Sequence, residues 1–140
     1  RVAMAVAQLS VFIESKVGHL KRVLEVFVEN DISVKGYALS DTGDYGIARF
    51  VVDKPQRAFE VLEAKGMAVK QADVLCLKLI DEPGELVRVF DVIAQQDMNV
   101  KYSYSLISTY IAVGVEDVAR AEAALAEQPV ELVSQVDFSA

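Results

Sequence analysis

The amino-acid sequence repeats itself once, at a nearly constant offset. Residues 18–23 read GHLKRV and residues 84–89 read GELVRV, which places the second segment 66 positions after the first (84 − 18). Downstream the offset falls to 63 (115 − 52), so the second copy has a shorter connection in its middle. The matching pairs that follow are Asp31/Asp97, Lys35/Lys101, Val52/Val115 and Leu62/Leu125. A repeat of this length indicates one supersecondary unit used twice.

Hydrophobic periodicity and turn signals predict the order β-α-β-β-α-β in each copy. In the first copy the expected elements are strand 5–14, a helix after it that ends at Asn30-Asp31, strand 32–40, turn 41–44, strand 46–53, helix 55–65 and strand 67–73. We therefore predict an α+β protein with domains 1–73 and 74–140. Right-handed crossovers make each domain a ferredoxin-like unit. Since no linker separates the copies, we expect one continuous eight-stranded antiparallel sheet with helices on one face.

Apolar side chains are expected on two surfaces of the first copy. The first helix should bury the face formed by Leu20, Val23, Leu24, Phe27 and Val28. The sheet face away from the helices is expected to carry Phe12, Tyr37, Leu39 and Val51. Such a patch seldom stays exposed, and the hydrophobic content is 53%. These features predict a homodimer.

Charge and composition exclude several classes of partner. The net charge is −7, and residues 74–140 carry it all, with 11 acidic and 4 basic side chains. No basic stripe is present, which argues against nucleic acid and anionic membrane surfaces. No apolar stretch reaches the roughly 18 residues of a membrane span. A lone cysteine, Cys76, favours a reducing compartment, so a cytoplasmic location is expected.

The sequence offers few residues for catalysis or metal binding. It has one histidine and one cysteine, too few for a usual metal site or a catalytic triad, and no glycine-rich phosphate loop. We expect no metal, no cofactor and no enzymatic activity. His19 is expected on an exposed first helical turn, and Cys76 is expected to fill space in the sheet.

The remaining candidate site is the loop 80–86, Ile-Asp-Glu-Pro-Gly-Glu-Leu, before the first helix of the second copy. Free N–H groups at Gly84, Glu85 and Leu86 would suit a carboxylate at the helix N-terminus, and Asp81 would suit an ammonium group. These groups fit the two charged ends of a free amino acid. The alternative is plain helix capping by the same residues.

At this point the sequence resembles a tandem ACT-domain protein over residues 6–138. The resemblance rests on the element order, on Asp81-x-Pro83-Gly84-x-Leu86 and on residues 97–100, Asp-Met-Asn-Val. The first copy keeps Gly18-x-Leu20 and residues 31–34, Asp-Ile-Ser-Val, but lacks the proline and the first aspartate. ACT domains are regulatory modules that bind small molecules, most often amino acids, at a seam between two domains.

The resemblance implies two sets of ligand-binding residues. In the second copy they are Asp81, Glu82, Pro83, Gly84, Glu85, Leu86 and Asn99. The pseudo-equivalent set in the first copy is Ser15, Lys16, Val17, Gly18, His19, Leu20 and Ser33. If the domains pair as they do in the family, one site combines the loop 81–86 with Ser33, and the other combines the loop 15–20 with Asn99. Because the proline and the aspartate are missing and Lys16 and His19 replace acidic residues, the first copy is expected to bind differently or not at all.

The expected function is that of a non-catalytic regulatory sensor for a free amino acid, with an enzyme or regulator as its partner. One alternative is a regulatory subunit of an amino-acid biosynthetic enzyme. Another is a small ferredoxin-like enzyme of the acyl-phosphate hydrolase type. The last is disfavoured because Arg22 and Arg88 fall within helices rather than in a phosphate loop.

Overall fold

The computed structural model describes residues 5–14, 17–41 and 43–139 of the 140-residue chain. These residues divide into two compact units. The first unit comprises residues 7–72 and 138–139, and the second comprises residues 5–6 and 73–137. Among the described residues, no helix is long and apolar enough to span a bilayer.

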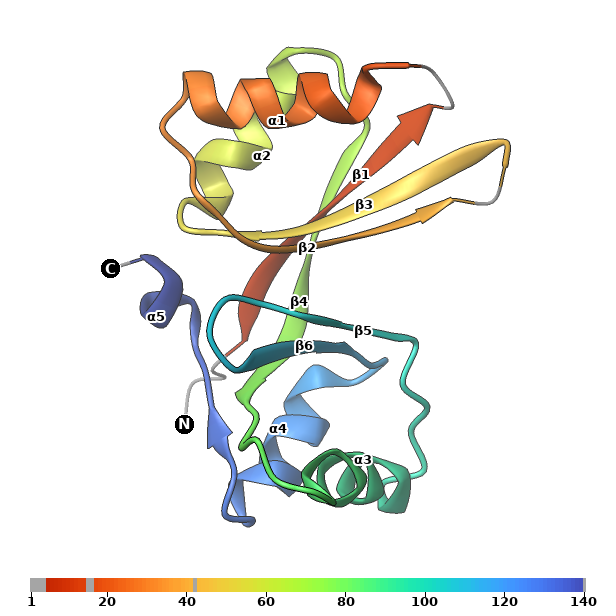
Figure 1. Cartoon of the computed structure of the whole chain (residues 1–140), viewed down its shortest axis with the longest axis vertical. Helices are drawn as coiled ribbons and strands as arrows, with labels where there is room; N and C mark the ends of the chain where they lie inside the picture. Colours follow the sequence, from red (N-terminus) through yellow and green to blue (C-terminus); the bar gives the residue numbers. More distant parts are fainter. Residues whose placement is uncertain (1–4, 15–16, 42, 140) are drawn as a thin grey trace. The chain divides into compact units, whose positions relative to one another are not determined.

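The first unit contains the first copy of the repeat. Its elements are β1 (Val6–Glu14), α1 (His19–Glu29), β2 (Val34–Asp41), β3 (Tyr45–Val52), α2 (Pro55–Ala64) and the start of β4 (Val69–Lys78). The strands lie in the order β2-β3-β1-β4, and β3 pairs antiparallel with both β1 and β2. Helices α1 and α2 cover one face of these strands (Figure 1). This is the predicted ferredoxin-like arrangement.

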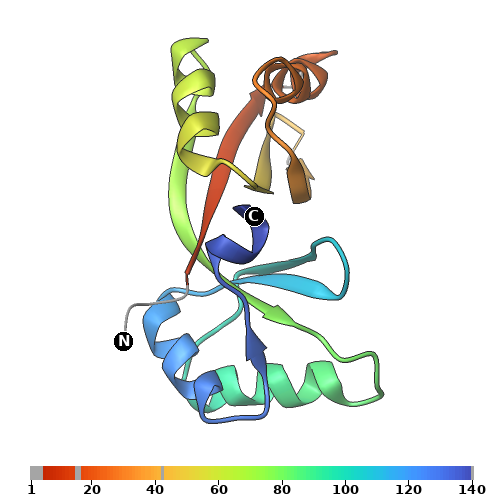
Figure 2. The ribbon, with the colours of Figure 1, turned by 90° about the vertical axis from the view of Figure 1, so that its left-hand side faces the viewer.

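The second unit repeats the arrangement. It contains the end of β4, α3 (Glu85–Gln95), β5 (Tyr102–Ser105), β6 (Tyr110–Gly114), α4 (Val118–Ala126), β7 (Glu131–Leu132) and the start of α5 (Gln135–Ser139), whose last two residues belong to the first unit. The strand order is β5-β6-β4-β7, which matches β2-β3-β1-β4 position by position. Helices α3 and α4 again share one face of the strands (Figure 2). The short helix α5 was not predicted.

Strand β4 explains why the predicted strand count is wrong. It runs unbroken for 10 residues and ends the first copy while it begins the second. The described part of the chain therefore has seven paired strands instead of the predicted eight. The α+β class and antiparallel pairing are confirmed. The continuity of the sheet across both copies stays a prediction.

The two copies share unusual backbone angles at equivalent positions. Gly18 and Gly84 precede their helices with φ of 87° and 85°. Asp31 and Asp97 follow the same helices with φ of 56° and 58°. Residues other than glycine seldom adopt such positive φ angles. The repeat therefore preserves the entry and the exit of its first helix as well as its core.

The buried face of α1 differs from the predicted one. The buried residues are Val23, Val26 and Phe27. The ring of Phe27 packs edge-on against that of Phe50, with the ring centroids 5.2 Å apart. Leu24 and Val28 were expected in the core, but they are 38% and 79% exposed. The helix is rotated so that the row containing Val26 faces the sheet. Both rows satisfy a spacing of three to four residues, so periodicity alone does not separate them.

The predicted outer face of the first sheet is also partly wrong. Residues directly opposite each other in an antiparallel pair point to the same side. Tyr37 and Leu39 lie opposite Phe50 and Ala48, which are core residues, so both belong to the helix-covered side. A register shift between Val34 and Gly36 accompanies this change.

The remaining two side chains of that predicted face are on the outer side. Phe12 pairs with Ile47 and Val51 pairs with Gln8. Phe12 is 43% exposed, whereas Val51 is fully buried. The exposed apolar patch predicted for the outer face is therefore reduced to Phe12 and its neighbours.

Candidate ligand-binding site

A cavity of about 370 Å³ lies in the second unit beside the start of α3. The β4–α3 loop forms one wall and the β5–β6 hairpin forms the other. The lining residues are Leu79, Ile80, Asp81, Glu82, Gly84, Glu85, Leu86, Val87, Ser105, Ser108, Thr109, Tyr110 and Ile111. The loop wall therefore coincides with the segment selected from the sequence.

The loop brings backbone N–H groups to the cavity. Gly84 turns the chain into α3, and the first helical hydrogen bond runs from the Arg88 N–H to the Gly84 carbonyl at 3.0 Å. The Glu85 N–H was predicted to be free, but it donates to the Glu82 carbonyl at 3.3 Å. The N–H groups of Leu86 and Val87 have no acceptor among the described residues, and no side chain caps the helix. Such a terminus attracts an anion.

The capping alternative explains the loop by acidic residues near the helix N-terminus, a proline at the first turn and a glycine for the bend, and an acidic side chain would then cap these N–H groups. In helix α4 such a cap is present, because the Asp117 carboxylate accepts from the Arg120 N–H at 3.0 Å. Helix α3 lacks an equivalent bond despite the acidic side chains of Asp81 and Glu82 before it. The first turn of α3 is therefore open to an external acceptor.

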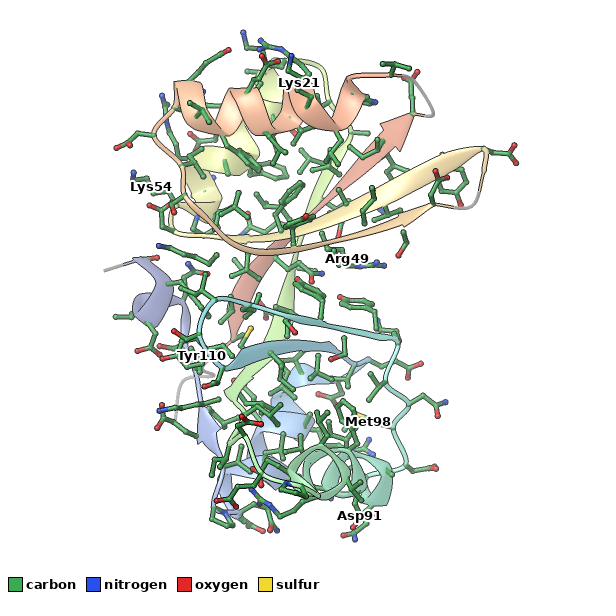
Figure 3. The ribbon with its side chains drawn as sticks, in the orientation of Figure 1. Lys21, Arg49, Lys54, Asp91, Met98 and Tyr110 are labelled. Atoms are coloured by element: carbon green, nitrogen blue, oxygen red, sulfur yellow. The ribbon has the colours of Figure 1, made fainter. Side chains whose placement is uncertain are left out.

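The hairpin wall was not predicted. The Leu79 N–H donates to the Thr109 carbonyl at 2.7 Å, which holds the hairpin against the end of β4. The hairpin closes through bonds from Leu106 to the Tyr110 carbonyl at 2.8 Å and from Tyr110 to the Ile107 carbonyl at 3.3 Å. Tyr110 is half-buried at the start of β6 (Figure 3). The drop in repeat offset from 66 to 63 falls in this region and marks a hairpin that differs between the copies.

The side chains of the cavity give it a defined chemistry. Three carboxylates line it, and no lysine, arginine or histidine does. Hydroxyl groups come from Ser105, Ser108, Thr109 and Tyr110. A small molecule with one carboxylate and one ammonium group suits this arrangement, because the helix terminus takes the anion and the acidic loop takes the cation.

The predicted residues of the second copy are only partly brought together. Asp81, Glu82, Gly84, Glu85 and Leu86 line the cavity. Pro83 does not line it and is exposed. Asn99, which the resemblance combines with the loop of the first copy, is also exposed.

The first copy forms a different and simpler site. Glu14, Val17, Gly18 and His19 line an open hollow of about 330 Å³. The imidazole Nδ1 of His19 accepts the Glu14 N–H at 2.8 Å, so His19 bonds to the backbone of β1. Leu20 packs against the core. Ser15 and Lys16 lie outside the described residues.

Ser33, which the resemblance combines with the loop 81–86 of the other domain, is hydrogen-bonded to the chain after β3. Its N–H donates to the Asp53 carboxylate at 2.8 Å, and its carbonyl accepts the Asp53 N–H at 3.0 Å.

The lone cysteine is a poor nucleophile. Cys76 is 2% exposed, and burial, with a smaller effect of the nearby Glu122 charge, raises the pKa of its thiol to about 12. At neutral pH the thiol is therefore protonated. In the described part of the chain, no cluster of three or more His, Cys, Asp or Glu side chains is arranged to hold a metal.

Comparison with known proteins identifies the family of the chain. The family described as "ACT domain pair" matches residues 4–139. No curated protein matches the chain. The crystal structure of protein BT0572 from Bacteroides thetaiotaomicron is similar, with a TM-score of 0.91 and 27% identity over 98% of this chain and 97% of that one.

Two further structures share the fold at lower identity. The regulatory subunit of aspartate kinase from Thermus thermophilus, in its ligand-free form, has a TM-score of 0.65 and 22% identity. The corresponding subunit from Thermus flavus has a TM-score of 0.63 and 22% identity. Each comparison covers 89% of this chain and 90% of the other chain.

Proposed function

Because the chain belongs to the ACT domain pair family, we propose that it is a non-catalytic regulatory protein that binds a free amino acid. The proposed site is the cavity between the β4–α3 loop and the β5–β6 hairpin. The fold sets no function by itself, so the proposal depends on the residues of this cavity.

The observation that carries the proposal is the uncapped start of α3 at the cavity wall. A ligand carboxylate would accept hydrogen bonds from the N–H groups of Leu86 and Val87, neither of which has an acceptor among the described residues. The α-ammonium group would face the carboxylates of Asp81 and Glu82, which also line the cavity. Both ends of an amino acid would then be recognised by groups from one loop.

The excess of carboxylates also limits which amino acids fit. An acidic ligand side chain would meet a cavity that already carries negative charge and has no lysine or arginine in its lining. Neutral and basic amino acids are therefore favoured over aspartate and glutamate.

A role beside an enzyme is the second candidate. Two structures with this fold are regulatory subunits of aspartate kinase. We propose that this chain likewise passes ligand binding on to a separate protein. A cytoplasmic location and contributions of Ser33 and Asn99 from a neighbouring domain remain part of the proposal.

A thermal-shift screen of the twenty free amino acids tests the proposed function. A ligand that binds the folded state raises the unfolding temperature, and saturation at about 100 times Kd adds about 2.7 kcal/mol. We expect at least one neutral or basic amino acid to do so. No shift with any of them would contradict the proposal.

Ser105→Trp locates the site. Ser105 lines the cavity from β5, where a bulky aromatic side chain is well tolerated and would occupy the ligand volume. We expect the thermal shift to disappear in this variant. Ser103→Trp is the matched control, since Ser103 lies two residues earlier on the same strand and outside the lining. Equal ligand binding by both variants would place the site elsewhere.

A further inference from the structure

Glu85 stands between two cavities of the second unit. Besides the cavity described above, a hollow of about 400 Å³ lies near the α4–β7 connection, with Lys78, Glu85 and Pro129 in its lining. Ile80 and Glu85 line both hollows. Of the two, only Glu85 carries a charge, so the position of its carboxylate affects the charge of the proposed ligand site.

Arg88 holds that carboxylate at two points. Its Nη2 lies 2.6 Å from one Glu85 oxygen, and its Nε donates to the other at 3.3 Å. The Glu85 side chain is only 11% exposed and that of Arg88 is 32% exposed. A two-point contact fixes direction as well as distance. The Glu85 carboxylate is therefore bound by Arg88 of the same helix and not by the free N–H groups at the helix N-terminus.

The same guanidinium is anchored outside α3. Nη2 of Arg88 also donates to the Pro129 carbonyl at 3.1 Å, in the connection between α4 and β7. This anchor fixes the guanidinium, and through it the Glu85 carboxylate.

The first copy provides an internal comparison. His19 replaces Glu85, and Arg22 replaces Arg88 at the same offset of 66. Arg22 pairs with Glu29 at 2.9 Å, and the two side chains are 42% and 51% exposed. The first copy thus has the equivalent arginine, but this arginine does not bind the residue equivalent to Glu85.

We infer that Arg88 is a positioning residue of the ligand site, an inference that rests on the proposed function. By engaging both oxygens of Glu85, Arg88 neutralises this carboxylate and keeps it from capping the N–H groups of Leu86 and Val87. Those N–H groups then remain available to the ligand carboxylate. Without Arg88, the free charge of Glu85 would compete with and repel that carboxylate.

Titration calorimetry on Arg88→Met tests the inference. The probes are the free L-amino acids and their α-carboxamides, which differ only in the group placed at the helix terminus. We expect the affinity for a bound free amino acid to fall by about tenfold or more, while that for its carboxamide changes much less. Arg88→Lys keeps the charge but loses the two-point contact, so its affinity for the free amino acid should lie between those of the parent and Arg88→Met. This variant replaces Arg88→Met in the test if Arg88→Met does not fold.

Two further variants separate positioning from structure. Adding Glu85→Gln to Arg88→Met removes the offending charge and should restore most of the affinity for the free amino acid. Arg22→Met should bind as the parent protein does. The inference would be overturned if Arg88→Met lost equal affinity for the free amino acid and its carboxamide and Glu85→Gln did not restore it. It would also be overturned if Arg88→Met lost no affinity at all. If the parent binds no free amino acid, the proposed function fails and takes this inference with it.

Discussion

Gly84 illustrates how a single residue shapes the candidate site. Its φ of 85° turns the chain from the acidic loop into α3, and Gly18 does the same before α1 with a φ of 87°. An added Cβ at either glycine would meet no atom within 4 Å. Replacement of either glycine by alanine therefore tests backbone strain, because the added Cβ meets no neighbour.

The first prediction concerns these two glycines. Gly84→Ala and Gly18→Ala should each lower the free energy of unfolding by about 1–2 kcal/mol, the cost of a left-handed conformation with a Cβ. Urea denaturation of both variants measures this change. Two variants as stable as the parent would show that the left-handed turns are not required.

The second prediction concerns Cys76 and alkaline pH. The folded protein keeps this thiol protonated up to a pKa of about 12, whereas the unfolded chain ionises it near the ordinary value of 9.0. Between these values the unfolded state binds fewer protons, so stability falls as pH rises. The slope from this group is at most about 1.4 kcal/mol per pH unit.

Comparison with Cys76→Ala isolates that contribution, because other groups also titrate in this range. Unfolding measured between about pH 9 and 10 should show a steeper loss in the parent than in the variant. The native thiol should also resist a disulfide exchange reagent at pH 8 until the protein is unfolded. Rapid labelling of the folded protein would contradict the burial of Cys76.

At the scale of elements, the β5–β6 pair contains one close cross-strand contact. Tyr102 lies opposite Gly114, and a Cβ built on that glycine would fall 2.2 Å from the Tyr102 ring. An aromatic ring packed over a cross-strand glycine shields its backbone and helps fix the register.

The third prediction follows from this contact. Gly114→Ala forces the ring of Tyr102 to move and should cost about 1–3 kcal/mol of stability, the usual penalty for overpacking. In a double-mutant cycle with Tyr102→Ala, the two losses should be less than additive, because the smaller side chain removes the clash. Strict additivity would show that the two residues do not interact.

The sequence predicts elements better than their pairing. Matching glycines and aspartates located both copies and both ends of α1 and α3, because these signals are local. The fusion of two strands into β4 and the shift between Val34 and Gly36 depend on contacts between distant segments, which one sequence does not encode in its periodicity. The same reason explains why the loop wall of the cavity was predicted and the wall carrying Ser105 and Thr109 was not.

At the scale of the whole molecule, exposed apolar side chains still favour self-association. Phe12, Tyr37 and Leu39 are 43%, 60% and 48% exposed in the first unit. The register assigns them to two sides of the sheet, so the interface would include the β2 edge as well as the outer face.

The fourth prediction is a homodimer of twice the 15.3 kDa chain mass. Light scattering at micromolar concentration should detect it, and Tyr37→Glu with Leu39→Glu should shift the population toward monomer by placing charges at the edge. A parent protein with the mass of one chain would contradict this prediction.

The central claim is that the carboxylate of an amino acid binds the uncapped N-terminus of α3. Nuclear magnetic resonance of backbone amides tests it most directly. When the amino acid that stabilises the protein is added, the amide protons of Leu86 and Val87 should move strongly downfield as they become hydrogen-bond donors, while those of the equivalent Leu20 and Lys21 should not. Saturable binding that leaves Leu86 and Val87 unchanged would contradict the account.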